Sequence, residues 1–169
     1  EQMKRAKEFD VLQISMWKLK QVNKLYGNSV GDQLLIDVAE ELKQIIAGNY
    51  IFRIHGNQFL IFSMNKADYE KTKKAVLKIF QTPFHVGDER IDFSATICGI
   101  TDVQELVDSD MMLAYLEYLI LLKPKSDKTT LIENSEETRQ GFLYEQRVKK
   151  YMNTAIEDDL FEVYYQPLY

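Results

Sequence analysis

The sequence predicts an α+β fold, an α/β sandwich in which helices surround a central mixed sheet. Short apolar runs of strand length alternate with amphipathic stretches that repeat every three or four residues. Two of these runs flank the turn-like segment His55-Gly56-Asn57-Gln58, which is typical of an antiparallel hairpin. The first apolar run of the chain, residues 9–16, is separated from the second, residues 50–54, by two predicted helices, so we expect these two strands to run parallel. A sheet with both directions and helices on its faces follows.

The elements of the first half follow from the spacing of their apolar residues. Residues 9–16 form an apolar run that predicts a buried strand, and residues 17–26 have helical spacing that ends at Gly27-Asn28. Residues 30–47 form the clearest amphipathic helix. The hairpin strands are 50–54 and 59–64, and Asn65 can cap a helix that extends to Phe80.

The second half predicts another hairpin, a long helix and a boundary. Residues 83–86 and 90–100 flank Gly87-Asp88 as hairpin strands, and Asp102 to Glu105 resembles a capping box that opens a helix to about Leu122. Residues 129–132 predict a short strand. A polar boundary at 134–139 is followed by an amphipathic helix to Asp159 and by the start of a strand at Phe161 to Tyr165.

We therefore divide the chain into one domain at 1–133 and a second segment at 134–169. The second segment holds a linker helix and the truncated beginning of another domain. The alternative, in which the last helix and strand pack on a single domain, stays open. The chain starts at Glu1 without a signal peptide, so we expect an internal fragment.

Composition excludes several classes of function. The chain has 169 residues, and its 26 acidic side chains outnumber 21 basic ones without any basic run, which argues against a nucleic-acid partner or an anionic membrane surface. The longest apolar stretch, around Leu119 to Leu122, is far shorter than the roughly 18 residues of a membrane span. The single cysteine, Cys98, cannot form an internal disulfide and fits a reducing compartment, so we expect a cytoplasmic location.

Carboxylates are missing where metal-assisted nucleotide chemistry needs them. Such a site holds magnesium with acids at fixed points, and two natural points here are the end of the first strand and the turn of the central hairpin. The strand ends in Ile14-Ser15-Met16 and the turn is His55 to Gln58. Neutral hydroxyl and amide oxygens are weak partners for a hard divalent cation, so we expect no metal site and no cofactor. His55 and His85 lack the neighbouring ligands of a zinc site.

Two segments together resemble the GGDEF family of diguanylate cyclases over about residues 1 to 132. Lys20-Gln-Val-Asn23-Lys-Leu-Tyr26-Gly27-Asn28-Ser-Val-Gly31-Asp32 is similar to the family pattern FKxIND-x-(F/Y)-GH-xx-GD. Thirty residues after Asn23, Arg53-Ile-His55-Gly56-Asn57-Gln58-Phe59 stands where the family has R-(F/Y)-GGDEF. The resemblance implies a nucleotidyl-cyclase-like, ferredoxin-type sheet.

The resemblance also implies roles for individual residues. Asn23 and Asp32 match positions that hydrogen-bond guanine in the family, so they are the candidate nucleotide-binding residues. Their alternative interpretation is a solvated helix residue and a helix N-cap. The family's metal-binding aspartate is replaced by Ser15, and the two acids of its motif by Asn57 and Gln58. At the first glycine stands His55, whose side chain would crowd a triphosphate.

Two further family features are absent. The inhibitory RxxD product site is replaced by Ile46-Ala-Gly-Asn49. The late-helix run AD-x-ALY-x-AK, whose lysine meets phosphate, is replaced by Ala114-Tyr-Leu-Glu-Tyr-Leu-Ile-Leu-Leu122. Lys123 and Lys125 follow the predicted helix end, so the lysine's role is not transferred to them.

The tail carries a second resemblance. Residues 143–169, with Phe161-Glu-Val-Tyr-Tyr165-Gln166-Pro167-Leu168, are similar to the opening of an EAL phosphodiesterase domain. This resemblance implies that Gln166 lies at a cyclic-di-GMP pocket that is incomplete in this sequence, and that an EAL domain in the same chain is the partner. The EAL acid and metal ligands would lie beyond Tyr169, so the whole protein, rather than this fragment, is expected to be the phosphodiesterase.

These observations favour a catalytically inactive GGDEF-like module of a bacterial cyclic-di-GMP signalling protein. It would regulate the attached EAL phosphodiesterase, either through GTP as a weak ligand or through packing and homodimer formation. Two alternatives stay open. One is an active cyclase that recruits unconventional metal ligands such as Asp10 or Asp32. The other is a structural or dimerisation spacer without a ligand.

Overall fold

The computed structural model describes residues 9–46, 50–101, 108–124 and 128–165. The chain divides into two compact units, Glu1–Asn134 and Ser135–Tyr169. The first unit contains every described strand and four helices, and the second contains one helix.

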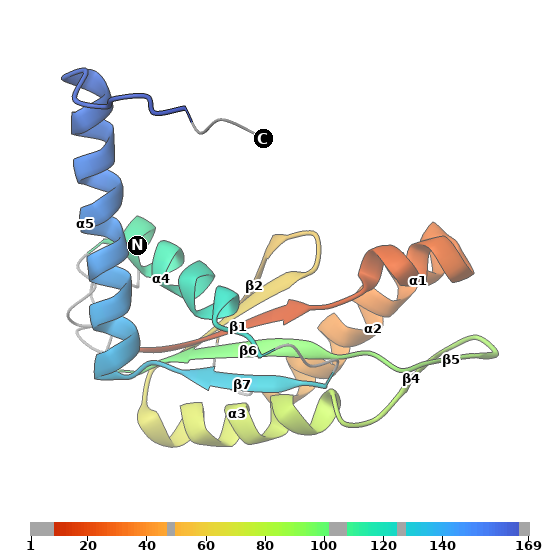
Figure 1. Ribbon diagram of the computed structural model, residues 1–169. Coiled ribbons are helices and arrows are strands. Elements are labelled where there is room, and N and C mark those ends of the chain that lie inside the picture. Colours follow the sequence, from red (N-terminus) through yellow and green to blue (C-terminus); the bar gives the residue numbers. More distant parts are fainter. Residues whose placement is uncertain (1–8, 47–49, 102–107, 125–127, 166–169) are drawn as a thin grey trace. The chain divides into compact units, whose positions relative to one another are not determined.

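The first unit is built on a five-stranded sheet with the order β2-β3-β1-β6-β7, accompanied by a two-stranded ribbon, β4-β5 (Figure 1). The strands are β1 (Asp10–Met16), β2 (Tyr50–His55), β3 (Gln58–Ser63), β4 (Phe84–Val86), β5 (Glu89–Ile91), β6 (Ala95–Ile100) and β7 (Thr130–Glu133). The helices are α1 (Leu19–Tyr26), α2 (Asn28–Ile45), α3 (Lys66–Ile79) and α4 (Ser109–Leu121). The predicted α+β fold with a mixed sheet is confirmed.

The directions of the strands explain why the sheet is mixed. β1 pairs antiparallel with both β3 and β6, β3 pairs antiparallel with β2, and β6 pairs parallel with β7. β1 and β2 therefore run parallel, as predicted, but they are not neighbours. The tight hairpin folds β3 back into the position between them.

Alternation along β1 gives the two faces of the sheet different roles. Leu12, Ile14 and Met16 belong to the buried core that also includes apolar residues of α2 and α3. Gln13 and Ser15 point to the other face, because successive side chains of a strand alternate. Figure 1 shows α3 and α4 on opposite faces of the sheet.

Local chemistry sets several helix ends. α1 ends at Gly27, whose φ of 92° favours glycine. Asn65 caps α3, as predicted, by accepting a hydrogen bond from the backbone N–H of Asp68. α4 begins after Asp108, whose side chain accepts a hydrogen bond from the N–H of Asp110. The capping box predicted at Asp102 to Glu105 lies outside the described residues.

The end of β7 is tied to α3 by a charged cluster. Lys73 donates hydrogen bonds of 2.7 Å to both Glu70 and Glu133, and the Tyr69 hydroxyl donates to Glu133 over 3.3 Å. Burial and the charge of Glu133 raise the pKa of Tyr69. Burial alone would lower the pKa of Lys73, but its hydrogen bonds to Glu133 and Glu70 outweigh burial and raise it. The cluster thus favours the protonated forms of Tyr69 and Lys73.

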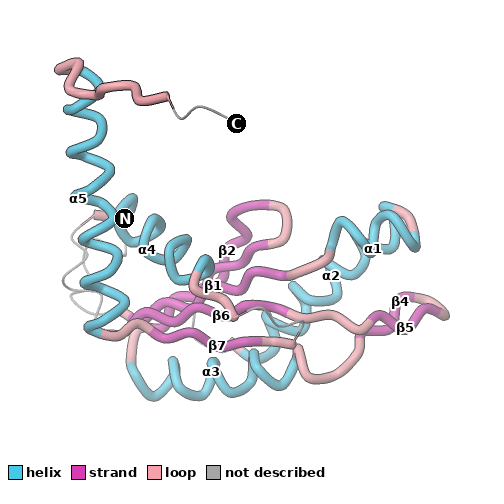
Figure 2. Tube along the Cα trace, viewed as in Figure 1, coloured by secondary structure: helices cyan, strands magenta, loops and turns pink. Residues whose placement is uncertain are grey.

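Two predicted strands are wrong in part. Residues 90–100 do not form one strand: β5 ends at Ile91 and β6 begins at Ala95, because the chain leaves the small ribbon and enters the central sheet between them. The second unit consists of α5 (Glu136–Glu157) and a following segment, and Phe161 to Tyr165 form no strand. Figure 2 shows that segment as loop. A strand needs a paired neighbour, and no described residue pairs with this segment.

α5 begins with a capping box, in which Ser135 accepts a hydrogen bond from the N–H of Thr138 and the Thr138 hydroxyl accepts one from the N–H of Ser135. Within the described ranges, none of the helices combines the length and the apolar character that crossing a membrane requires.

Candidate functional site

The end of β1 and the turn of the β2–β3 hairpin meet at one end of the sheet. Ser15 lies directly opposite Gln58 on β3 and opposite Thr96 on β6. β2 ends at His55 and β3 begins at Gln58, which leaves Gly56 and Asn57 as the turn. The predicted hairpin is therefore confirmed, and the fold brings Ser15, Asn57 and Gln58 together, whereas Asn23 lies on α1 and Asp32 on α2.

Side-chain amides join the hairpin turn to β1. The Asn57 side-chain amide donates a hydrogen bond to the carbonyl oxygen of Met16, and the Met16 N–H donates to the Asn57 carbonyl oxygen over 3.0 Å. The Gln13 side chain donates to the side-chain oxygen of Gln58 over 3.3 Å. These contacts satisfy polar groups of the turn within the protein.

The turn is also held from β2. The Arg53 guanidinium donates two hydrogen bonds to the carbonyl oxygen of Gly56, at 3.0 Å from Nε and 2.5 Å from Nη2. A Cβ at Gly56 would meet no heavy atom within 4 Å, and the neighbouring His55 is exposed. His55 thus pairs with Gln58 across the turn while its side chain stays exposed.

The residues at this sheet end do not fit a magnesium centre. Ser15 is 4% exposed, and together with Asn57 and Gln58 it offers one hydroxyl and two amides. Hard divalent cations prefer carboxylate oxygens, which also compensate their charge. Throughout the described residues, no group of three or more His, Cys, Asp or Glu side chains is arranged to hold a metal ion.

The two carboxylates considered as substitutes lie elsewhere. Asp10 is the first residue of β1 and lies opposite Ser63, whereas Ser15 lies opposite Gln58. Five residues of strand separate Asp10 from Ser15 by about 17 Å. Asp32 is exposed on α2. Asp10 therefore lies at the opposite end of β1 from Ser15.

Asn23 packs closely against α2. A Cβ at Gly31 would lie 1.7 Å from Asn23 Oδ1, so only glycine leaves room for this amide. Oδ1 is buried and has no hydrogen-bond partner among the described residues. The Asn23 side chain as a whole is half-buried, and Asp32 is not an N-cap, because α2 begins at Asn28. The guanine-binding role of both residues stays a prediction, and Gln166 lies outside the described residues.

Sequence reasoning missed a tryptophan–lysine pair beside the same strand end. The Trp17 indole N–H donates a 2.7 Å hydrogen bond to the Thr96 hydroxyl. The Lys123 ammonium lies 3.7 Å from the centroid of the Trp17 ring, which is a cation–π contact. No local pattern reveals this pair, because Lys123 follows α4 and Trp17 follows β1.

Comparison with known proteins identifies the family of the first unit. The family model described as "Diguanylate cyclase, GGDEF domain" matches residues 1–114. Diguanylate cyclase DgcP of Escherichia coli K12 is 27% identical over 121 residues, which are 69% of this chain and 36% of DgcP. MucR of Pseudomonas aeruginosa, a bifunctional diguanylate cyclase/cyclic di-GMP phosphodiesterase, is 32% identical over 94 residues, 54% of this chain and 14% of MucR.

The fold is shared with solved structures. An EAL/GGDEF domain protein from M. capsulatus superimposes with a TM-score of 0.65 at 21% identity, over 76% of this chain and 85% of that one. The chain spans only about a third of DgcP and a smaller share of MucR. Fold, hairpin position and family match together establish that this chain belongs to the GGDEF domain family.

Proposed function

We propose that the first unit is a catalytically inactive GGDEF domain of a bacterial cyclic-di-GMP signalling protein. It regulates an EAL phosphodiesterase domain carried by the same chain rather than making the dinucleotide itself. The observation that carries this proposal is the set of neutral side chains at Ser15, Asn57 and Gln58, whose amides hydrogen-bond to Met16 and Gln13.

The proposal follows from the charge that the reaction develops. Phosphoryl and nucleotidyl transfer depend on metal ions that neutralise charge on the phosphate oxygens. A hydroxyl and two amides leave a divalent cation uncompensated, and the nearest substitute on β1, Asp10, begins the strand at its other end. The alternative of an active cyclase with unconventional ligands lacks, among the described residues, any group of three or more His, Cys, Asp or Glu side chains that could hold a metal ion.

The attached EAL domain is supported by the second unit. Its large apolar side chains are mostly solvent-exposed, with Tyr151 at 72%, Ile156 at 63% and Tyr164 at 85%. A run of exposed aromatic and aliphatic residues marks a surface that another part of a protein covers. An EAL domain that continues this segment would cover it and place Gln166 at its dinucleotide pocket. MucR shows that the two activities occur together in one relative.

A cyclase assay tests the proposal. The protein is incubated with GTP and either magnesium or manganese, and formation of cyclic-di-GMP is followed by chromatography. We expect no turnover above a blank without protein. Steady multiple turnover with either metal would refute the inactive assignment.

Calorimetry separates a GTP-binding regulator from a ligand-free spacer. Binding that is abolished by Asn23→Ala supports the guanine role of Asn23 and weak GTP regulation. Absence of heat at millimolar GTP, about 1 mM or above, favours the ligand-free structural or dimerisation spacer. Gln44, exposed on α2, supplies the matched control variant Gln44→Ala.

A further inference from the structure

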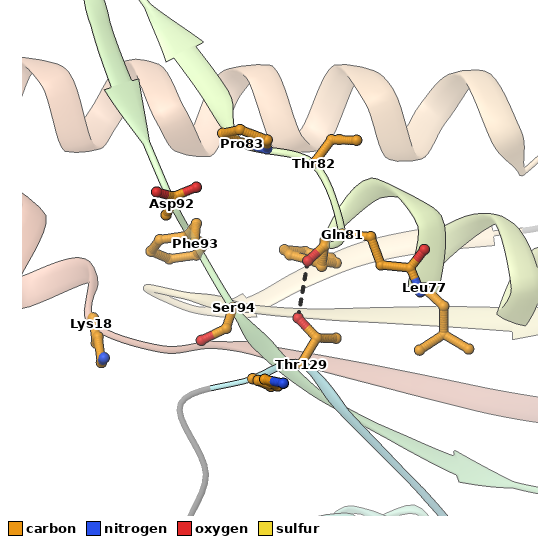
Figure 3. Close-up of a pocket in the computed structure, with 11 residues that line it drawn as sticks. Lys18, Leu77, Gln81, Thr82, Pro83, Asp92, Phe93, Ser94 and Thr129 are labelled. Atoms are coloured by element: carbon orange, nitrogen blue, oxygen red, sulfur yellow. Dashed lines mark hydrogen bonds between the residues drawn. The ribbon is translucent and has the colours of Figure 1, made fainter.

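A pocket of about 580 Å³ lies where α3 ends and where β6 and β7 begin. Figure 3 shows Lys18 on one side of it and Leu77 on the other, with Phe93, Ser94 and Thr129 between them. Pockets of this volume are typical of small-molecule sites.

This pocket is separate from the hairpin turn. Phe80 and Phe93, which line it, belong to the core that also contains Ile14 and Met16. Ser15 points to the opposite face of the sheet from these two neighbours, because side chains alternate along β1. The pocket therefore lies on the α3 side, and its ligand does not depend on the proposed regulatory function.

Hydrogen bonds fix the walls of the pocket. The Thr129 hydroxyl donates to the carbonyl oxygen of Phe80 over 3.1 Å and accepts from the N–H of Ala95 over 3.3 Å. The backbone N–H of Trp17 donates to the carbonyl oxygen of Ser94 over 2.9 Å. These contacts tie the end of α3 and the chain after β1 to the start of β6, so the cavity is preformed.

The lining carries a net positive charge. Lys18 and Lys128 contribute two cations, and Asp92 contributes one carboxylate. The same cavity presents apolar surface from Leu77 and from Phe93, which is 7% exposed. An anion with an apolar body matches both properties, whereas an apolar cation does not match the charge and a fully polar anion does not match the apolar surface.

Lys18 adopts a conformation that glycine normally occupies. Its φ of 67° and ψ of 11° place it in the left-handed region, which L-residues other than Asn and Asp rarely adopt. Such strain persists at sites where the surroundings or function require it. A lysine at this position places a charged side chain at the pocket although its backbone conformation is unfavourable for a residue other than glycine.

We propose that this pocket binds a small organic anion: a ring-sized apolar body that carries one carboxylate or phosphate group. The apolar body lies against Leu77 and Phe93, and the acidic group pairs with Lys18 and Lys128. All the residues that line the pocket belong to the first unit.

The full chain is titrated with benzoate and with phenyl phosphate while the heat of binding is recorded by isothermal titration calorimetry. We expect a saturable change with a dissociation constant of about 1 mM or tighter for at least one of them. Benzyl alcohol and inorganic phosphate, which each lack half of the chemistry, should bind at least about tenfold more weakly, a difference of about 1.4 kcal/mol.

Variants assign the binding to the pocket. Lys18→Gly removes the ammonium and relieves the positive φ, so its folding is not at risk, and we expect about fivefold weaker binding. Lys128→Gln should act similarly, whereas Lys74→Gln on the exposed side of α3 should have no effect. No saturable change with either aromatic acid up to about 10 mM, or an equal loss in Lys74→Gln and Lys18→Gly, would overturn the proposal.

Discussion

The side-chain amide of Asn57, in the hairpin turn, donates a hydrogen bond to the carbonyl oxygen of Met16, the last residue of β1. In the family pattern that this chain resembles, acids occupy the turn. An amide can donate to a carbonyl oxygen, whereas an ionised carboxylate only accepts. Asn57 thus makes a contact within the fold that an ionised acid at this position could not make.

This contact predicts a stability cost when it is removed. Asn57→Ala should lower the free energy of unfolding by about 1–2 kcal/mol, because the Met16 carbonyl and the turn lose a hydrogen bond. Thermal unfolding followed by circular dichroism should show a midpoint lower by about 3–6 °C. Gln44→Ala, an exposed control, should leave the midpoint within about 1 °C. An Asn57→Ala midpoint equal to that of the wild type would show that the contact does not stabilise the turn.

Restoring acids should restore a response to magnesium. Ser15→Asp with Gln58→Glu places two carboxylates on directly opposite residues while Asn57 stays in place. Their repulsion should destabilise the double variant without metal, and magnesium should raise its unfolding midpoint by mass action. The wild-type midpoint should not respond. If magnesium stabilises the wild type as much as the variant, the argument from neutral ligands is wrong.

The Lys73 cluster predicts alkaline lability. The pKa of Tyr69 is raised above 10.0 by burial, and that of Lys73 above 10.5 by its hydrogen bonds to Glu133 and Glu70. The folded state therefore holds these protons more tightly than the unfolded chain. Their stabilising contribution is complete below about pH 10 and is lost as pH rises through the folded pKa values.

Lys73→Met should test this contribution. At pH 8 the free energy of unfolding of Lys73→Met should be lower than that of the wild type by about 1 kcal/mol, because the ammonium that pairs with both Glu70 and Glu133 is lost. Between about pH 9 and about pH 11, a range that spans the ordinary pKa values of tyrosine and lysine, the thermal unfolding midpoint of Lys73→Met should fall less than that of the wild type. Lys74→Met, on the exposed neighbour, should follow the wild type. Parallel curves for Lys73→Met and the wild type would contradict the assigned cause.

The thiol of Cys98 should be inert in the folded protein. Burial raises the pKa of Cys98 to about 12, and its side chain is fully buried on β6. Because the thiolate is the nucleophile, reaction with a disulfide reagent at pH 8 should be at least about 100-fold slower than in denaturant. Cys98 is the single cysteine, so the absorbance change reports it alone. Comparable rates in both conditions would mean that β6 opens readily.

Local chemistry made much of the fold predictable. The Gly56-Asn57 turn, the Asn65 cap and the Gly27 helix end depend on neighbouring residues, and the structure has all three. The gap between β5 and β6 was missed because the apolar pattern continues through Phe93, although the chain changes sheets there. The strand expected at Phe161 to Tyr165 has the right pattern but no described strand beside it.

The candidate site divides in the same way. Sequence position relative to the hairpin placed Ser15, Asn57 and Gln58 together, and the strand register agrees. The contact of Lys123 with Trp17 and the pocket beside Lys18 depend on segments far apart in the chain. Spacing within one helix or strand carries no information on such contacts.

The most direct test of the central claim is to locate a divalent ion. Crystals of the protein soaked with GTP and manganese can be measured by anomalous diffraction, which identifies manganese without reference to its ligands. The account predicts no anomalous peak between Ser15 and the turn formed by Gly56 and Asn57. An ordered manganese ion there, coordinated by Ser15, Asn57 or Gln58, would contradict it.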